Sequence, residues 1–210
     1  MMALCALVMV VSVRAFVAEY RVALQVNGTT NDFIDALSAA EGKEIQVFGA
    51  RLARDLMVRC ARTLNIAPRL LSDLELHSKV ADSCRYSAEF IIINAPANPR
   101  ALTVLLSAAA RVDAALYGRA QAAAPFEPWN LYNRLKVVQR QPSLSASAAA
   151  LVDADLGHAL ASDWGRRAVA GIYRDSTALR PAITAAAERL PPRDQAAFLD
   201  LLRHGVGGAG

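Results

Sequence analysis

The sequence predicts a mainly α-helical protein, because alanine runs and apolar residues at helical spacing recur along most of its 210 residues. Alanine favours helix since it loses no side-chain entropy when the backbone winds up. Apolar residues make up 54% of the chain and charged residues 20%, a balance typical of a folded core. We expect an antiparallel four-helix bundle with a minor β element and one long connection.

The first expected bundle helix follows the Asn27-Gly28 turn signal and ends near Gly42. Any of three polar residues can cap it: Thr30, Asn31 or Asp32. The second helix ends at Pro68. In both helices apolar residues recur every three or four positions: Phe33, Ile34, Leu37 and Ala40 in the first, and Ile45, Phe48, Leu52, Leu56 and Cys60 in the second.

A strand and a third helix are expected next. The pattern from Leu70 to Ala88 is mixed and predicts no single element. Phe90–Ile93 is mostly β-branched and lies before the Pro96–Pro99 turn signal, so it predicts a strand. Pro99 suits the first turn of a helix, and apolar positions at helical spacing continue to about Tyr117.

A long connection and a fourth helix follow. Residues 124–142 contain three prolines among basic and aromatic side chains, which predicts a long loop. The fourth helix starts at Ser143 or Ser145 and ends near Tyr173. Two shorter helices are expected at about 182–190 and 194–202. We therefore divide the chain into an apolar N-terminal segment (1–30), a helical-bundle domain (31–177) and a C-terminal extension (178–210).

The charge of the chain is basic and depends mostly on arginine. The net charge is +4, and only three of the 23 cationic side chains are lysines. Guanidinium presents a planar fork of donors that suits phosphate, so this bias is typical of a phosphate-backbone binder. A GC-rich genome produces the same bias, and both explanations stay open.

Cysteine and histidine are too sparse to indicate a reactive or metal centre. Cys5, Cys60 and Cys84 have no C-x-x-C spacing and cannot all pair, so we expect reduced, buried thiols. The three histidines are not clustered, and no P-loop, dinucleotide fingerprint, nucleophile elbow or metal motif occurs. We expect no catalysis, no cofactor, no metal and no small-molecule substrate.

The N-terminus leaves a second class of protein open. Residues 2–13 are apolar over the length of a signal-peptide core, and Val13–Ala15 resembles a cleavage site. Asn27–Thr29 is a glycosylation sequon. A signal peptide requires a positive charge before its apolar core, and none precedes this apolar run. A secreted or membrane-attached helical protein therefore remains an alternative.

Residues 129–140 mix aromatic and cationic side chains, the combination that single-stranded nucleic acid sites use for base stacking and phosphate contact. A solvated loop is the other interpretation. Arg111 lies at the end of the third expected helix, where a cation complements the helix dipole with or without a ligand. Asp153 and Asp155 suit the first turn of the fourth helix for the same electrostatic reason.

Three groups of residues occur in a particular order between positions 31 and 177. They are Phe33–Leu37 with Ala40, Gly42, Gln46 and Ala50-Arg51; Arg85–Ala88 with Pro99 and Leu105-Leu106; and Val152-Asp153 with Gly171 and Tyr173–Ser176. In order and spacing they resemble the first helix pair, the short strand with the third helix, and the fourth helix of tobamovirus coat proteins. The likeness extends more loosely to the benyviruses, also rod-shaped plant RNA viruses.

The resemblance implies a four-helix bundle with a long inner loop that faces single-stranded RNA. Such a coat protein self-assembles with further copies into a helical rod around the genome, forming a virion in the host cytoplasm. Ala150 and Leu151 stand where the family has arginines, so other cations must supply that charge, and Asn98 replaces a family carboxylate. The expected RNA-binding residues are Arg111, Arg119, Arg134, Lys136, Arg140, Asp153 and Asp155.

A helical adaptor is the third class that the sequence permits. Trp129 and Trp164 are the two tryptophans of the chain. Large aromatic side chains often anchor protein interfaces. We therefore keep binding of another protein through either tryptophan as an alternative to the coat-protein hypothesis.

Overall fold

The computed structural model describes residues 12–13, 16–17, 20, 22–23, 26–40, 49–67, 70, 72–141 and 143–205. Every regular element with stated bounds in these ranges is a helix, which confirms the mainly α-helical class. None of these helices combines the length and hydropathy needed to cross a bilayer. Most of the apolar segment 1–26 and its cleavage-like site lie outside the described residues.

The chain folds as two compact units, Met1–Ala108 (unit 1) and Ala109–Gly210 (unit 2). This boundary falls inside the expected 31–177 domain and separates its first half from its second. Unit 2 also includes the expected 178–210 extension together with the helices that precede it. The compact units and the expected segments are thus divided at different positions.

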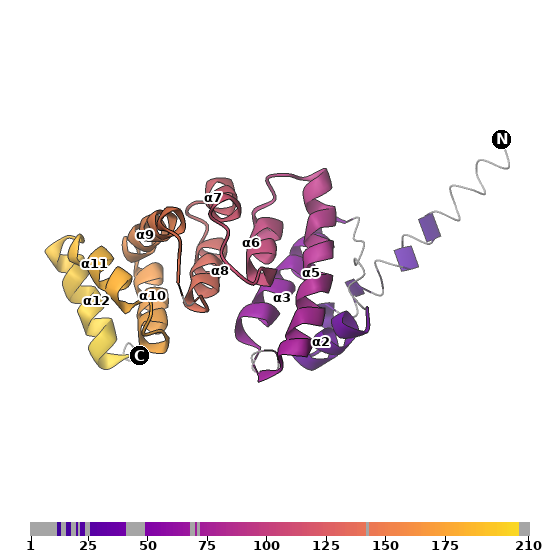
Figure 1. Cartoon of the computed structure of the whole chain (residues 1–210), viewed down its shortest axis with the longest axis horizontal. Coiled ribbons are helices and arrows are strands. Elements are labelled where there is room, and N and C mark those ends of the chain that lie inside the picture. Colours follow the sequence, from indigo (N-terminus) through magenta and orange to yellow (C-terminus); the bar gives the residue numbers. More distant parts are fainter. Residues whose placement is uncertain are drawn as a thin grey trace. The chain divides into compact units, whose positions relative to one another are not determined.

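Unit 1 is built around one long helix. Its helices are α2 (Thr30–Ala39), α3 (Ala50–Ile66), α5 (Leu74–Asn94) and α6 (Pro99–Ala108). Helix α5 packs against each of the other three, and α3 also packs against α6 (Figure 1). The apolar residues at helical spacing form the core, with Phe33, Leu37, Leu56 and Leu64 almost fully buried.

The N-cap of helix α2 lies one residue before the first of the three expected caps. Thr29 is its N-cap, and its hydroxyl accepts a hydrogen bond from the Asp32 N–H at 3.2 Å. The Asp32 carboxylate accepts in return from the Thr29 N–H at 2.9 Å, which completes a capping box. Hydrogen bonds from the Thr29 side chain and then its backbone lower the pKa of Asp32 below the usual 3.8.

The expected strand at Phe90–Ile93 is wrong, because these residues form the last turn of α5. Ser83, Ser87 and Ile91 are buried at successive positions four residues apart, so the helical stripe continues through the β-branched run. Packing of this stripe overrides the local β preference. Ile93 lies off the stripe and is 78% exposed.

A disulfide bond joins Cys60 of α3 to Cys84 of α5. Both side chains are fully buried, so the expectation of burial was right and that of reduced thiols was wrong. The two residues are 24 positions apart and meet because α3 and α5 pack together. That contact is tertiary, and no local spacing rule predicts it.

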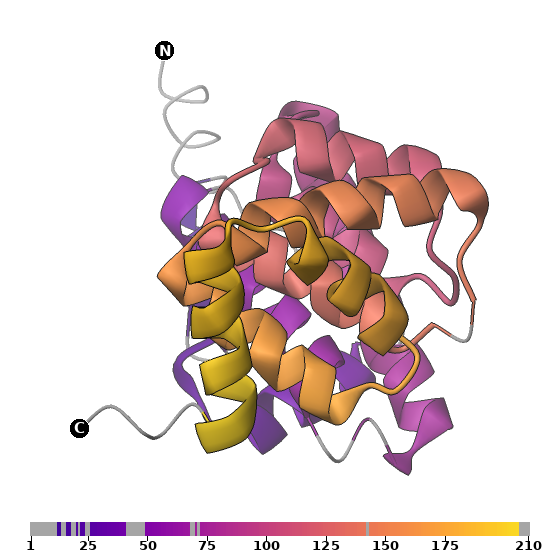
Figure 2. The same ribbon diagram turned by 90° about the vertical axis from the view of Figure 1, so that its left-hand side faces the viewer.

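The described residues of unit 2 form six helices in two layers, which we call the hairpin stack. They are α7 (Ala114–Ala123), α8 (Pro128–Gln139), α9 (Ala146–Leu160), α10 (Asp163–Asp175), α11 (Arg180–Glu188) and α12 (Pro192–His204). In one layer α9 contacts both α7 and α11, and in the other layer α10 contacts both α8 and α12 (Figures 1 and 2). Successive helical hairpins stacked in this way are the architecture of α-solenoids.

Three expectations about this half of the chain are wrong. The third expected helix stops at Ala108, and α7 begins separately after its N-cap Asp113. The expected long loop contains α8, because Glu127 caps a helix whose first residue is Pro128. The fourth expected helix is two helices, α9 and α10. The prolines and polar residues that predicted a loop instead lie at the starts of helices.

The break between α9 and α10 depends on two residues. Ser162 caps α10 by accepting a hydrogen bond from the Gly165 N–H at 3.1 Å. A Cβ at Gly165 would overlap the carbonyl group of Ala159, so only glycine permits this close approach. The two helices expected at the C-terminus are confirmed as α11 and α12, which pack on α9 and α10 and complete the stack.

Candidate functional site

The seven expected RNA-binding residues are distributed over different parts of unit 2. Arg111 lies in the turn before α7, and Arg119 lies on α7; both are exposed. These two guanidinium groups are accessible to a phosphate backbone. Four of the other five pair with side chains of neighbouring helices, and the fifth, Arg140, is the C-cap of α8.

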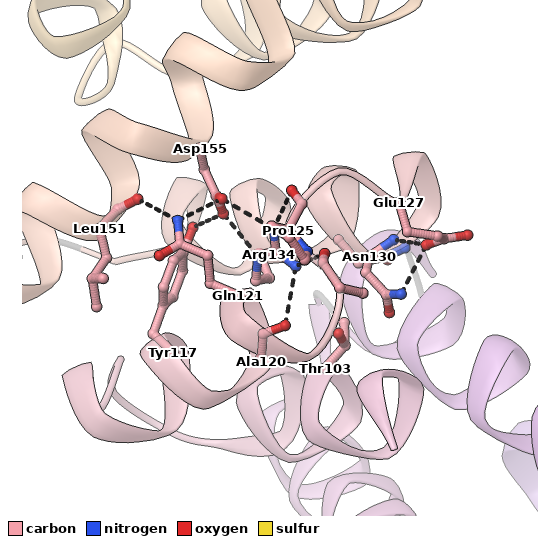
Figure 3. A network of polar contacts seen from close by, with 12 residues as sticks. Thr103, Tyr117, Ala120, Gln121, Pro125, Glu127, Asn130, Arg134, Leu151 and Asp155 are labelled. Atoms are coloured by element: carbon pink, nitrogen blue, oxygen red, sulfur yellow. Dashed lines mark hydrogen bonds and ion pairs between the residues drawn. The ribbon is translucent and has the colours of Figure 1, made fainter. Parts of the chain in front are cut away.

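Arg134 and Asp155 form a salt bridge in the core of unit 2 (Figure 3). Both side chains are fully buried. Arg134 Nε donates to Asp155 Oδ2 at 2.7 Å, and Nη2 donates to Oδ1 at 3.0 Å. Arg134 also donates to the carbonyl oxygens of Ala120, Ala124 and Pro125, at and beyond the end of α7. All five guanidinium N–H groups therefore have acceptors.

The Asp155 carboxylate is equally well satisfied. Besides the two bonds from Arg134, it accepts from the Tyr117 hydroxyl at 2.7 Å and from Gln121 Nε2 at 2.7 Å. Gln121 Nε2 also donates to the carbonyl oxygen of Leu151 at 3.1 Å. Burial, followed by the charge of Asp155, raises the pKa of Tyr117 well above 10.0. Tyr117 is therefore a neutral donor to the carboxylate at neutral pH.

This network joins α7, α8 and α9 and has a structural role. Its members occupy one another's hydrogen-bonding groups and are shielded from solvent, so Arg134 and Asp155 cannot contact RNA in this structure. The sequence predicted a loop at Arg134 and the first turn of the fourth helix at Asp155. Both assignments are corrected by the packing of α8 against α9.

The remaining three residues bind other parts of the stack. Lys136 Nζ lies 3.6 Å from Asp175 of α10 and donates to Gln139 at 2.9 Å. Asp153 accepts from Arg189, the C-cap of α11, at 2.6 Å. Arg140 is the C-cap of α8, and burial lowers its pKa. The structure does not bring the seven residues together on one surface.

A different group of side chains forms a groove between α8 and α10. It is open and shallow, has a volume of about 390 Å³, and is lined by Tyr132, Trp164, Arg167 and Ala168. The rings of Tyr132 and Trp164 meet edge to face with centroids 6.4 Å apart. Trp164 remains 38% exposed, and Arg167 is exposed beside it.

Helical spacing explains why these side chains share one face. Tyr132 and Lys136 are four residues apart on α8, and Trp164 and Ala168 are four residues apart on α10. The Lys136 ammonium lies 5.7 Å from the centroid of the Tyr132 ring, a cation–π distance. The salt bridge from Lys136 to Asp175 links the same two helices.

The electrostatics of this groove are set by Arg167. Lys136 has a carboxylate partner, whereas the side chain of Arg167 has neither a hydrogen bond nor a salt bridge within the described ranges. Its neighbour Arg166 is nearly buried and pairs with Asp163 and, at 3.1 Å, with Asp194 of α12. The groove therefore presents two aromatic rings and one uncompensated cation.

Sequence reasoning identified part of this groove. It named Trp164 as a possible contact for another protein but placed it within a single long helix. It placed Tyr132 in a loop. The signal that could have joined them is the four-residue spacing on two separate helices, which is visible only when the boundaries of α8 and α10 are known.

No group of metal-binding side chains occurs among the residues that the structure describes. No protein-family model, no curated protein and no solved structure matches this chain. The candidate function is therefore argued from the geometry of the two units.

Proposed function

We propose that this chain is a non-enzymatic helical scaffold that binds a peptide segment of a partner protein in the groove between α8 and α10. The observation that carries the proposal is the pair formed by the half-buried Tyr132 and the exposed Trp164, beside the uncompensated Arg167. Tryptophan, tyrosine and arginine are enriched among residues that dominate binding energy at protein interfaces. Stacked helical hairpins commonly present such surfaces to their partners.

The chemistry of the groove selects one kind of partner segment. An aliphatic or aromatic side chain would pack on Trp164 and Tyr132, and a carboxylate would pair with Arg167. We therefore expect a peptide with an acidic residue close to a large apolar residue. The aromatic rings supply contact area, and the guanidinium supplies orientation and charge selectivity.

A random peptide library selected on the immobilised full-length chain tests this proposal. Enriched peptides should share an acidic and an apolar residue. Arg167→Glu should weaken their binding by about tenfold or more, since the cation is replaced by a like charge. Trp164→Ala should weaken binding by a similar factor.

Two control variants in the same unit are matched to these changes. Arg193→Glu reverses an exposed charge on α12, and Phe126→Ala removes an exposed aromatic ring before α8. Both should bind the selected peptides as the unchanged chain does. Enriched peptides that bind Arg167→Glu with unchanged affinity, or a library with no enriched sequence, would refute the groove as the site.

The coat-protein hypothesis stays a second proposal, supported by the exposed Arg111 and Arg119 and by the dominance of arginine over lysine. It predicts rods or stacked discs in negative-stain electron microscopy of the purified chain with single-stranded RNA. Arg111→Ala should then reduce RNA packaging without unfolding the subunit. Particles of uniform small size at every pH and salt concentration, with no bound RNA, would reject it.

The secreted alternative is supported by the buried Cys60–Cys84 disulfide, because disulfides persist mainly in oxidising compartments. It predicts export, shortening at the N-terminus and glycosylation at Asn27 when the gene is expressed in a eukaryotic cell. Mass spectrometry of the cellular and exported protein distinguishes the outcomes. An intact, reduced product in the cytosol would contradict it.

A further inference from the structure

Unit 1 contains a cavity that the proposed peptide groove does not involve. Its volume is about 800 Å³, and it lies between α2 and the residues just before it on one side and α3 on the other. Both helices pack against α5, which positions them around this space. The size is within the range of about 300–1,000 Å³ that is common for small-molecule sites.

One face of α3 supplies the charged wall of the cavity. Asp55, Arg59, Arg62 and Ile66 recur every three or four residues, so they line the same side of the helix. The guanidinium groups of Arg59 and Arg62 are therefore neighbours. Two like charges this close repel each other, and an anion between them would relieve the repulsion.

Arg59 is held in place before any ligand arrives. Its Nη1 donates to the carbonyl oxygen of Val26 and its Nη2 to that of Gly28, both at 2.5 Å. The guanidinium carbon lies 5.1 Å from the centroid of the Phe33 ring. Burial, and then the charge of Arg62, lowers the pKa of Arg59, as expected for a cation beside another cation.

Arg62 is exposed at the edge of the cavity and is available to a ligand. Its side chain makes no hydrogen bond or salt bridge within the part of unit 1 that the structure describes. Among the described residues of the lining, Asp55 carries a carboxylate, which has cationic partners of its own: Arg54 at 3.2 Å and Arg51 at 4.0 Å. The charge of Asp32 also acts on Arg59, and Asp32 is hydrogen-bonded to Thr29. These two carboxylates lie near four guanidinium groups, so the cavity retains a positive character.

Apolar side chains lie on both sides of the cavity. Val26 and Ile34 lie on the α2 side beside the polar Thr30 and Asn31, and Val58 and Ile66 lie among the charged residues of α3. Ile66 is 44% exposed, so its side chain is accessible to a ligand in the cavity. A ligand that contacts both the guanidinium groups and these aliphatic side chains needs an anionic head and an aliphatic part.

We propose that this cavity binds an amphipathic organic anion, with a carboxylate or phosphate head on Arg62 and Arg59 and an aliphatic chain against Val58 and Ile66. Guanidinium groups pair with both kinds of head through two parallel hydrogen bonds. The site is in unit 1, so it is independent of the peptide groove in unit 2.

Isothermal titration calorimetry of the full-length chain tests the site with four probes: octanoate, octyl phosphate, acetate and octyltrimethylammonium. Octanoate or octyl phosphate should bind, and the stronger of the two identifies the head group. Acetate and the cationic probe should not bind measurably. Equal binding of the cationic probe, or no binding of either amphipathic anion, would overturn the proposal.

Variants then separate the charged contact from the apolar contact. Arg62→Gln should weaken binding of the preferred anion by about tenfold or more, because an exposed charge-assisted contact is lost without disturbing the fold. Ile66→Ser, which removes the aliphatic surface without adding a charge, should weaken it by a similar factor. Arg167→Gln, in unit 2, should leave it unchanged. Unchanged binding by Arg62→Gln would assign the anion to another site and reject the inference.

Discussion

In unit 1 a covalent bond links two of the helices, whereas in unit 2 a buried ion pair does so. The Cys60–Cys84 disulfide joins α3 to α5, and the Arg134–Asp155 salt bridge joins α8 to α9. The disulfide acts mainly by restricting the unfolded chain. The ion pair acts in the folded state, where each partner compensates the desolvation of the other.

Because the two links differ in chemistry, different perturbations should destabilise unit 1 and unit 2. Reduction of the disulfide should act on unit 1 and leave the salt bridge intact. Removal of one charge in the salt bridge should act on unit 2, because it leaves the other charge buried without a partner. Hydrogen exchange measured along the chain can report the two units separately.

The largest effect is expected for Asp155→Ala. It leaves the Arg134 guanidinium buried without its carboxylate and removes an acceptor from Tyr117 and Gln121. We expect unit 2 to lose about 3–5 kcal/mol of unfolding free energy in urea titrations followed by circular dichroism. Protection from hydrogen exchange should fall in α7, α8 and α9.

Asp153→Ala is the matched control for this variant. Asp153 lies two residues earlier on the same helix and forms an exposed salt bridge with Arg189. Its loss should cost less than about 1 kcal/mol. If the two variants were equally stable, the buried network would not hold the hairpin stack together.

The next largest effect is expected when both Cys60 and Cys84 are changed to alanine. The disulfide closes a chain segment with a sequence separation of 24, and a loop of this length corresponds to about 3 kcal/mol of stabilisation. Hydrogen exchange should increase in α3 and α5, with α8 and α9 unchanged. Faster exchange across unit 2 would show that the units are not independent.

A reductant provides the control for this experiment. The unchanged chain should show the same loss of protection in α3 and α5 once its disulfide is reduced. The double alanine variant should not respond to the reductant. A response of equal size in the double variant would mean that the reductant acts elsewhere in the chain.

A smaller effect is expected for Gly165→Ala in the hairpin stack. The new Cβ would overlap the backbone of Ala159, so α10 must shift away from the end of α9. We expect a loss of about 1–3 kcal/mol in thermal or urea unfolding, in the range of other overpacked sites. The Tyr132–Trp164 groove should also change, which fluorescence of Trp164 can report in a Trp129→Phe background.

Gly157→Ala and Gly171→Ala are the matched controls. Both glycines lie within helices, and a Cβ at either position would meet no atom within 4 Å. These variants should stabilise the protein by about 0.5–1 kcal/mol, because alanine is the better helix former. A loss of stability in either variant would contradict the explanation that Gly165→Ala acts through overlap with Ala159.

The smallest effect is expected for Thr29→Ala at the start of α2. Loss of the N-cap hydroxyl should cost about 1 kcal/mol, measured by urea unfolding at neutral pH. Ser145→Ala, at the N-cap of α9 in unit 2, is the matched control and should cost a similar amount. A much larger cost at Thr29 would mean that α2 is critical to the whole of unit 1.

The capping box also predicts an acid dependence in unit 1. The pKa of Asp32 is lower in the folded chain than the usual 3.8, so its contribution is present above that pH. It is lost as the pH falls through the lowered pKa. Nuclear magnetic resonance titration should show the Asp32 pKa returning toward 3.8 in Thr29→Ala, and an unchanged pKa would contradict the hydrogen-bond explanation.

The sequence predicted those parts of the fold that depend on local chemistry. Alanine content and apolar spacing predicted helices, and Pro99 was correctly placed at the start of one. The helices near 182–190 and 194–202 were also expected, and the structure places them at α11 and α12. Capping and periodicity act within a few residues, so they can be identified without knowledge of the fold.

Other features were decided by contacts between distant residues. Phe90–Ile93 became helical because α5 is buried along one stripe, and α9 and α10 separated at the close approach of Gly165 to Ala159. For the candidate sites, the sequence identified arginine-rich and aromatic segments but not their surroundings. Arg134 is in the core and Arg167 on the surface because packing determines which cation meets a carboxylate and which meets solvent.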